Sequence, residues 1–435
     1  MAWDFSTDPE FQAVLDWMKV FVRDEVEPLD LVFRRPEDPF DPASPAQAAM
    51  APLKKIVKEK GLWACHLGPE LGGKGFGQLK LGLMNEILGR SRFAPTVFGT
   101  QAPDTGNAEI LARFGTEAQK AKYLQPLLDG EIASCYSMTE PQAGADPAEF
   151  TCKATREGDS WVIEGEKWFA SHAWFAEFLI VMAITDPKVP VHEGSSMIIV
   201  EKGTPGLEIV RNVTVGPHDE IGAGVHGYLR FNRCKVPQAN VLGPVGGGFM
   251  VAQSRLGGGR VHHAMRTVGM LNKAMEMMCE RVVSRRTKGE RLADKQMVQE
   301  KIADSYTQIL QFRLHVLYAA WLLDRDKAYT RDVRREISAV KAAMPGVLKD
   351  VVYRALHLHG SLGMSNETPL MNMWQYVPEM GIVDGPTEVH KVSVAKDVLR
   401  NVAPSPGVFP TYNVPERRAA AEKKFAAFLK GSDKK

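Results

Sequence analysis

One acidic side chain stands out near the C-terminal end of the chain, within the segment 381–390, which reads Gly-Ile-Val-Asp-Gly-Pro-Thr-Glu-Val-His. Asp384 lies between the apolar pair Ile382–Val383 and the backbone-bending pair Gly385–Pro386. A carboxylate with such neighbours loses part of its hydration and becomes a stronger base than it is in water. We therefore predict that Asp384 abstracts a proton from a substrate. The alternative is an ordinary turn, because Asp, Gly and Pro are also typical turn residues.

Other side chains that could do chemistry do not match a known motif. The glycine clusters Gly243–Gly248 and Gly257–Gly259 lack the glycine spacing of a phosphate-binding loop, so we predict no Rossmann site. The histidines at 262–263 and at 357 and 359 have no carboxylates at ligand spacing, and we assign them packing or hydrogen-bonding roles and predict no metal. A Gly-x-Ser-x-Gly elbow is also missing, which argues against an acyl hydrolase.

Composition restricts the class of protein further. A chain of 435 residues with 44% hydrophobic content can form two or three domains with buried cores. The 54 basic and 52 acidic residues are spread along the chain, so we predict no nucleic-acid partner and no anionic membrane surface. Five cysteines without a Cys-x-x-Cys pair fit a reducing compartment. The acidic N-terminal sequence, and the lack of an apolar run near the ~20 residues of a membrane span, predict a cytoplasmic protein.

Periodicity predicts which elements must position Asp384. The segment Thr7–Glu10 offers a helix cap, and apolar residues then recur at helical spacing up to Val22. Further helices are expected around 46–61, 77–91, 105–114 and 116–128. Between 133 and 244 the sequence changes to short β-branched and aromatic runs typical of strands, at residues 161–163, 178–182, 197–200, 207–210 and 228–231.

Beyond Gly246–Gly248 the helical period returns and continues. Apolar residues recur every three or four positions from Ala264 to Val282 and again from Ile302 to Leu323, which predicts long helices packed as a bundle. We therefore expect a mainly α protein with a central β-domain. The expected boundaries are 1–132 for an N-terminal helical domain, 133–244 for a middle β-domain and 245–405 for a C-terminal bundle. Residues 406–435 are expected to be a peripheral tail with a helix at 416–430.

Several separated segments together resemble one family, the acyl-CoA dehydrogenases. Residues 137–146, Ser-Met-Thr-Glu-Pro-Gln-Ala-Gly-Ala-Asp, resemble the family's Thr-Glu-Pro-x-Ala-Gly-Ser-Asp signature, and 165–171, Gly-Glu-Lys-Trp-Phe-Ala-Ser, resemble its Gly-x-Lys-x-Trp-Ile-Thr strand. Residues 236–249 look like the family's link between the β-domain and the C-terminal helices. The segments 285–296 and 357–363 are similar to the family's Arg-x-Thr-Phe-Gly...Gln and Gln-x-x-Gly-Gly-x-Gly segments. The resemblance extends over roughly residues 5 to 402.

The resemblance implies a three-domain fold, in which a middle β-barrel-like domain lies between helices and a C-terminal four-helix bundle, and it implies FAD as cofactor. It assigns Asp384 as the catalytic base and the following residues to the cofactor: Met138, Thr139, Phe169, Ser171, Arg285, Thr287, Gln296, His357, Gly360, Ser361 and Glu388. It assigns three residues to the substrate: Ala145, Arg260 and Gly385. Arg285 and Gln296 would reach the FAD of a neighbouring subunit, which implies a homodimer or a homotetramer.

The chain departs from the family pattern at its final motif. Most relatives have Tyr-Glu-Gly-Thr with glutamate as base, whereas this chain has Val383–Pro386, close to the Asp-Gly-Pro type in which aspartate takes over. A minority of the family carries the base just before the arginine matched by Arg260, but Gly257–Gly259 offers no carboxylate there. Phe169 and Ser171 replace tryptophan and threonine, and His357 replaces glutamine. Ala145 replaces a serine, which leaves that substrate contact in doubt.

The implied reaction is dehydrogenation of an acyl-CoA thioester to a trans-2-enoyl-CoA, as in fatty-acid β-oxidation. The base removes the α-proton, the β-hydrogen passes to FAD as a hydride, and the backbone N–H of Asp384 donates to the thioester oxygen. The implied electron acceptor is an electron-transfer flavoprotein. Two alternatives stay open: an acyl-CoA oxidase or other flavin enzyme of the same fold, and a non-catalytic acyl-CoA-binding or scaffold protein, against which the retention of Asp384, Arg260 and Thr139 argues.

Overall fold

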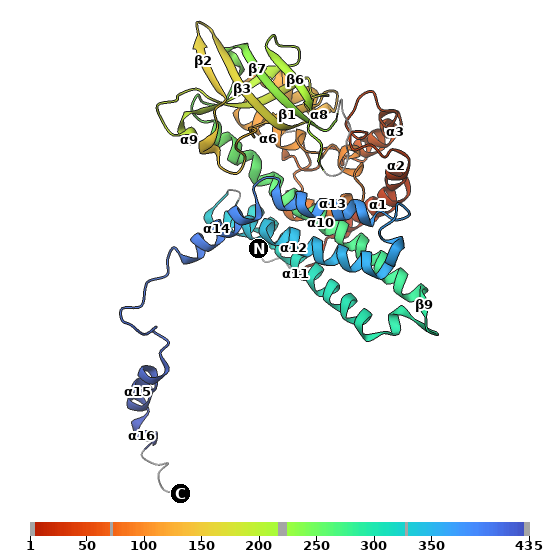
Figure 1. Ribbon diagram of the computed structural model, residues 1–435, viewed down its shortest axis with the longest axis vertical. Helices are drawn as coiled ribbons and strands as arrows, with labels where there is room; N and C mark the ends of the chain where they lie inside the picture. The colour runs from red at the N-terminus through yellow and green to blue at the C-terminus, as the bar shows by residue number, and fades with distance from the viewer. Residues whose placement is uncertain (1–4, 70–72, 216–223, 327–328, 430–435) are drawn as a thin grey trace. The chain divides into compact units, whose positions relative to one another are not determined.

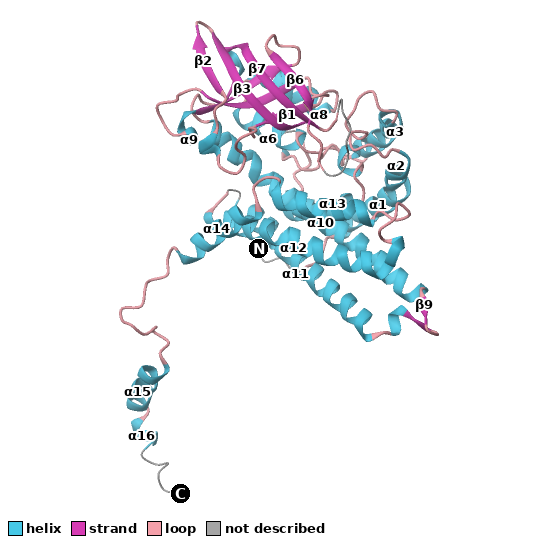
Figure 2. Ribbon diagram, viewed as in Figure 1, coloured by secondary structure: helices cyan, strands magenta, loops and turns pink. Residues whose placement is uncertain are grey.

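A computed structural model of the chain describes residues 5–69, 73–215, 224–326 and 329–429. The described residues up to Lys391 form one compact unit, in which helices come first, a β-sheet follows and long helices return (Figures 1 and 2). This order confirms the predicted helix, strand, helix organisation. Residues 392–429 belong to a second unit.

The N-terminal helices begin where the sequence predicts a cap. The Asp8 side chain accepts a hydrogen bond of 2.8 Å from the backbone N–H of Phe11, and Pro9 takes the first helical position. Helix α1 then buries one apolar face that includes Leu15 and Met18. The helices are α1 (Pro9–Phe21), α2 (Glu27–Val32), α3 (Ala46–Glu59), α4 (Gly77–Leu88), α5 (Ala94–Val97), α6 (Asp104–Phe114), α7 (Glu117–Gln119) and α8 (Gln125–Asp129).

The middle of the chain forms one sheet, and each of the five predicted strand segments lies in a strand of it. Its strands are β1 (Ser134–Ser137), β2 (Lys153–Glu157), β3 (Ser160–Ser171), β4 (Phe178–Ile184), β5 (Ser195–Glu201), β6 (Leu207–Asn212), β7 (His226–Pro237) and β8 (Val241–Leu242), with the short helix α9 (Val191–Gly194) before β5. They pair in the order β6-β7-β3-β1-β4-β5-β8, and β2 pairs with β3 and β4. The long antiparallel pair β3 and β7 carries two irregularities in register.

Long helices follow the sheet and bury the predicted apolar stripes. Helix α10 (Gly248–Ser284) buries Ala264, Val268 and Leu271, and it contacts α4, α6, α11 and α12. The remaining elements are the hairpin β9 (Arg286–Thr287) and β10 (Glu290–Arg291), then α11 (Gln296–Asp326), α12 (Arg331–His359), α13 (Leu370–Ile382) and α14 (Thr387–Leu399). One hydrophobic core joins α10, α11, α12 and α13 to α1, α3 and α4.

The second unit contains the C-terminal half of α14 and the tail. The predicted tail helix is present as α15 (Val414–Lys424) and α16 (Ala426–Leu429), while Lys430 lies outside the described residues. Within the described residues no helix is both long and apolar enough to cross a membrane.

Candidate active site

Asp384 lies in the short connection between α13 and α14, in a backbone conformation that few side chains adopt. Its φ is +54°, and the φ of Gly385 is +108°. A non-glycine residue in the left-handed region costs free energy and persists only where its surroundings hold it. A Cβ at Gly385 would come within 2.9 Å of the His390 Nε2 atom, so this position requires glycine.

Two side chains hold the backbone of Asp384 in place. The Arg260 Nε donates a hydrogen bond of 2.8 Å to the Asp384 carbonyl oxygen. The His390 Nε2 lies 3.3 Å from the same oxygen. Because both partners bind the carbonyl, the Asp384 carboxylate is left free of these contacts. Arg260 therefore has a defined position beside the predicted base.

The three glycines before Arg260 let α10 approach its neighbours closely. A Cβ at Gly257 would come within 2.4 Å of the Tyr329 ring, and a Cβ at Gly259 would come within 3.0 Å of the Asp384 Oδ2. Gly257–Gly259 lies within helix α10. The absence of a side chain at Gly259 makes room for Asp384. The sequence showed only that these glycines do not form a nucleotide loop.

The surroundings of the Asp384 side chain differ from the apolar ones expected from its sequence neighbours. Ile382 is 66% exposed and cannot shield the carboxylate. The side chain of Asp384 is 19% exposed, and its Oδ2 lies 3.6 Å from the His263 Nε2. Shielding comes from α10 and α12 instead, and these helices supply basic groups. At the end of α13, Asp384 meets side chains from segments that are distant in the sequence, so its sequence neighbours do not reveal its environment.

The basic groups near Asp384 respond to burial and to its charge. Burial lowers the pKa of Lys341, on α12, to about 8, and the Asp384 charge opposes that shift. The Lys341 Nζ donates to the carbonyl of Met380 near the end of α13. Burial also lowers the pKa of His263 to about 4, so this imidazole is neutral at neutral pH. Burial lowers the pKa of Arg260, and the charge of Asp384 opposes that shift.

Another carboxylate approaches the same stretch of α10, but it already has a cationic partner. The Glu109 Oε2 would lie 3.2 Å from a Cβ at Gly258. Its other oxygen, Oε1, forms an ion pair of 2.8 Å with Arg113. Burial raises the pKa of Glu109, and Arg113 opposes the rise. Of the two carboxylates, Asp384 is the one without a cation at ion-pair distance.

Four residues predicted to contact the flavin lie together on the sheet. The Trp168 backbone N–H donates 3.0 Å to the carbonyl of Thr139, which joins the segment after β1 to β3. Between Lys167 and Ala170, β3 has one residue more than β7, and this bulge accompanies a φ of +48° at Phe169. Met138, Thr139, Phe169 and Ser171 are thus brought to one region. Tyr136, on β1, is close enough to Asp384 for its charge to add to the burial that raises the Tyr136 pKa.

A buried ion pair between Lys167 and Glu140 holds the segment after β1 against β3. The Lys167 Nζ lies 2.8 Å from the Glu140 Oε1 and also donates 2.8 Å to the Met138 carbonyl. The side chains are 0% and 1% exposed. The Glu140 carboxylate accepts from the backbone N–H groups of Thr151 and Cys152 as well. Burial would raise the pKa of Glu140, but Lys167 and these bonds hold it below its usual value.

The groups near the bulge fit a flat aromatic cofactor with hydrogen-bonding atoms on its edge. Phe169 is 41% exposed and lies edge-on to Trp168. The Trp174 Nε1 is buried without a hydrogen-bond partner among the described residues. The Ser171 hydroxyl lies 3.0 Å from the His226 Nδ1, and burial lowers the His226 pKa to about 4. An exposed aromatic ring on the sheet, and a buried donor without a partner three residues after Ser171, are features that a bound ligand would explain.

A second set of predicted cofactor residues lies at the other end of the bundle. Arg285, Thr287 and Gln296 belong to the β9–β10 hairpin region, which Figure 1 shows away from β1 and β3. The end of α12, which carries His357, Gly360 and Ser361, reaches the same end of α10, where the Arg281 Nη2 donates 3.4 Å to the His359 carbonyl. The structure does not bring this set to the Phe169 region within one chain. Ala145 and Glu388 are exposed.

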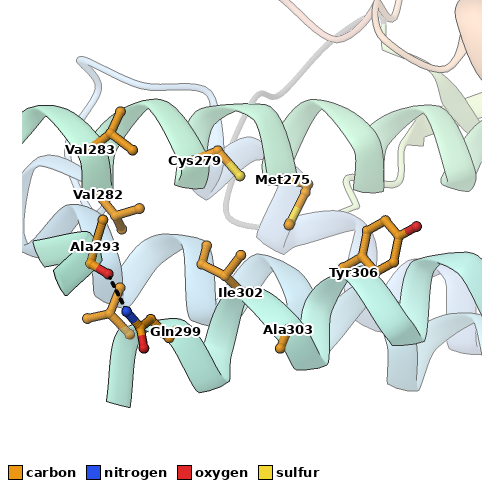
Figure 3. Close-up of a pocket in the computed structure, with 10 residues that line it drawn as sticks. Met275, Cys279, Val282, Val283, Ala293, Gln299, Ile302, Ala303 and Tyr306 are labelled. Carbon is orange, nitrogen blue, oxygen red and sulfur yellow. Dashed lines mark hydrogen bonds between the residues drawn. The ribbon is translucent and has the colours of Figure 1, made fainter. Parts of the chain in front are cut away.

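An apolar groove lies away from Asp384. It has a volume of about 430 Å³ between the C-terminal part of α10 and the N-terminal part of α11 (Figure 3). Its lining is mostly apolar and includes Met275, Cys279, Ile302 and Tyr306. Met275 is 12 residues beyond His263 on α10, about 18 Å along the helix axis. The only titratable side chains among the described residues that line this groove are the thiol of Cys279 and the phenol of Tyr306. Since this described lining holds no carboxylate or histidine, we assign the candidate reaction site to the Asp384 region.

Several side chains of the site were not predicted from the sequence. His226 faces Ser171, while Lys341 and His390 face Asp384. His263 was predicted to have a packing or hydrogen-bonding role, but its place beside Asp384 was not predicted. The one usable signal was His390, which lies within the Asp384 motif itself. Lys341 lies on a helix 43 residues away and has no motif around it.

The chain belongs to the acyl-CoA dehydrogenase family. Family models for the N-terminal, middle and C-terminal domains of acyl-CoA dehydrogenases match residues 8–131, 135–234 and 246–399. The members of this family are oxidoreductases that use FAD, and the residues near the Phe169 bulge fit that cofactor.

Known proteins show the same relationship. The chain is 41% identical over 352 residues to the Mycobacterium tuberculosis protein named "Probable acyl-CoA dehydrogenase FadE2", covering 80% of this chain and 84% of that protein. It is 38% identical over 355 residues to acyl-CoA dehydrogenase family member 11 of Rattus norvegicus, covering 81% of this chain but only 45% of that longer protein. The butyryl-CoA dehydrogenase structure from Megasphaera elsdenii superposes with a TM-score of 0.78 at 27% identity, covering 92% of this chain and 100% of that one.

Proposed function

We propose that this protein dehydrogenates an acyl-CoA thioester to the trans-2-enoyl-CoA, with Asp384 as the base that takes the α-proton. The observation that carries the proposal is the arrangement of Asp384. Its backbone is fixed by Arg260 and His390 while its carboxylate stays free, and Gly259 leaves room beside Oδ2. A base held in one geometry is what proton abstraction next to a carbonyl requires.

Each residue has a defined part in this proposal. Asp384 takes the proton from the α-carbon, and its backbone N–H donates to the thioester oxygen, where negative charge develops. The chemistry that FAD supplies is acceptance of the β-hydrogen as a hydride. Thr139 and Ser171 would hold the flavin by hydrogen bonds, and Phe169 would pack against it. The electrons then pass to an electron-transfer flavoprotein, and the reaction belongs to fatty-acid metabolism.

The cofactor and the reaction can be tested together. Purified protein should be yellow, and it should release FAD and not FMN when it is denatured. Addition of acyl-CoA thioesters under anaerobic conditions should bleach the flavin absorbance, and enoyl-CoA should appear in equal amount. A colourless protein that cannot be reconstituted with FAD, or a flavin that no thioester of a chain-length series reduces, would contradict the proposal.

We further propose that the active unit is a homodimer or a dimer of dimers. Arg285, Thr287 and Gln296 lie away from the Phe169 region of their own chain, which supports the proposal that they contribute to a site on another subunit. The apolar groove of Figure 3 and an exposed stripe on α11 support such contact. The stripe consists of Tyr306, Leu310, Leu314 and Tyr318, which repeat every four residues and are 38–60% exposed.

Charges introduced into this stripe should separate the subunits. The double variant Leu310→Glu and Leu314→Glu is expected to lower the mass measured by light scattering and to weaken FAD retention, because a site shared between subunits is lost. Val20→Glu, at an apolar residue of α1 that is half exposed, is the matched control and should change neither. A wild-type monomer that holds FAD and turns over would contradict the proposal.

A further inference from the structure

A group of polar side chains that are buried or partly buried lies near Asp384 and has no part in the reaction proposed above. His262 and Arg266 lie one turn apart on α10, and His66 belongs to the segment between α3 and α4. The ring centroids of His66 and His262 are 6.4 Å apart. The charge of Arg266 contributes to the low pKa values of both histidines, after burial. We call these three side chains the His66 cluster.

Three ring nitrogens of the His66 cluster lack hydrogen-bond partners among the described residues. Both ring nitrogens of His66 and the Nε2 of His262 are buried without a hydrogen bond among the described residues. Arg266 forms no ion pair with any residue that the structure describes. Folded proteins pair nearly all buried polar atoms, since each unpaired one costs free energy. Three unpaired nitrogens together indicate a ligand that supplies the missing partners.

The charge states of the cluster define which ligand fits. Burial lowers the pKa of His66 to about 4 and that of His262 well below its usual value, so both rings are neutral at neutral pH. Each neutral ring offers one N–H donor and one acceptor nitrogen. Burial lowers the pKa of Arg266 only to about 10, so this group stays cationic. An oxygen atom that accepts hydrogen bonds matches this set, whereas a hydrocarbon leaves it unpaired.

The cluster is close to the reacting centre. His263, the neighbour of His262 in sequence, has its Nε2 3.6 Å from the Asp384 Oδ2. The Asp384 charge also acts on Arg266, whose pKa it raises against the effect of burial. From Gly259, which faces Asp384, the helix axis advances about 10 Å to Arg266. An acyl chain that runs about 10 Å along α10 from Asp384 would reach the level of Arg266.

We propose that the acyl group of the substrate carries an oxygen substituent, a hydroxyl or a carboxylate, which hydrogen-bonds to His66, His262 and Arg266. This inference rests on the proposed acyl-CoA dehydrogenation and names its substrate class. Sites built to hydrogen-bond a substituent reject the analogue that lacks it much more strongly than apolar pockets reject an extra methylene. The cluster is thus a specificity-determining site, and Asp384 remains the base.

The test compares matched substrates. Straight-chain acyl-CoAs are assayed beside acyl-CoAs of the same length that carry a hydroxyl at successive positions or a terminal carboxylate, and kcat/KM is measured with an artificial electron acceptor. We expect at least one substituted compound to exceed its unsubstituted counterpart by on the order of 10²-fold or more. The hydroxyl and carboxylate arms distinguish a neutral from an anionic substituent.

Variants locate the preference at the cluster. His66→Phe and His262→Phe should each reduce the ratio of substituted to unsubstituted kcat/KM at least tenfold, while the unsubstituted rate is retained. The ratio within one variant is insensitive to partial loss of folded enzyme, and FAD content reports folding separately. His192→Phe, at an exposed histidine of α9, is the control and should leave the ratio unchanged.

Three outcomes are informative. A wild-type enzyme that prefers unsubstituted chains at every length would overturn the inference and leave the proposed dehydrogenation intact. Variants that change both substrates equally would assign the cluster a structural role only and would also overturn it. Failure of every thioester, substituted or not, to reduce the flavin would instead contradict the proposed dehydrogenation itself.

Discussion

Asp384→Asn is expected to lower the rate at which acyl-CoA reduces the flavin by on the order of 10²–10⁴, the usual contribution of a general base. The amide has nearly the size of the carboxylate but cannot take a proton. The contacts that Arg260 and His390 make are to the Asp384 carbonyl oxygen and do not depend on the side chain. The variant should therefore keep its fold, its FAD and its affinity for acyl-CoA. Stopped-flow flavin bleaching under anaerobic conditions measures the rate directly.

Asp384→Glu provides the matched comparison, because it keeps the charge and adds one methylene. We expect partial activity, since a misplacement of about 1 Å can cost roughly 10²-fold in rate. Because Gly259 has no side chain, there is some space beside Oδ2, and the longer glutamate side chain would have to fit into it. If Asp384→Asn reduced the flavin as fast as the wild type, another group would have to be the base, and Glu109 would be the next carboxylate to test.

The fold was predictable because its elements are long and regular. The stripe from Ala264 to Val282 on α10 follows the 3.6-residue period over five turns, and the strand runs at 178–182 and 197–200 are almost wholly apolar. Such patterns arise from burial of one face or of both faces, and burial decides the element. The short helices α13 and α14 around Asp384 were not predicted separately, because Pro378 and Pro386 interrupt the pattern there.

The site was predictable only where its residues lie in continuous motifs. Asp384, Thr139 and Phe169 lie in short stretches that resemble family motifs, so the roles proposed for them could be predicted from the sequence. Lys341 and His66 contribute single side chains from otherwise ordinary segments. Only tertiary packing brings Lys341 near Asp384 and His66 near His262 of α10. The expectation that Ile382 shields Asp384 was wrong for the same reason. Ile382 is exposed, and side chains such as Lys341, which are distant in the sequence, lie near Asp384 instead.

The Phe169 region depends on a buried charge pair whose loss should have the second large effect. Lys167→Met leaves the Glu140 carboxylate buried without its cation, and removal of one partner of such a pair typically costs about 3–5 kcal/mol of stability. The variant also loses the hydrogen bond to the Met138 carbonyl, so FAD retention should fall. The midpoint of urea unfolding and the FAD content after gel filtration measure the two effects.

A double variant separates the charge from the packing. With Glu140→Gln added to Lys167→Met, no uncompensated charge remains, and the glutamine oxygen can still accept from the backbone N–H groups of Thr151 and Cys152. Its loss of stability should therefore be smaller than that of Lys167→Met alone. Lys202→Met, which breaks the half-exposed pair with Glu177 in the same domain, is the control and should cost less than about 1 kcal/mol. Equal effects of Lys167→Met and Lys202→Met would show that the buried pair does not hold the flavin region in place.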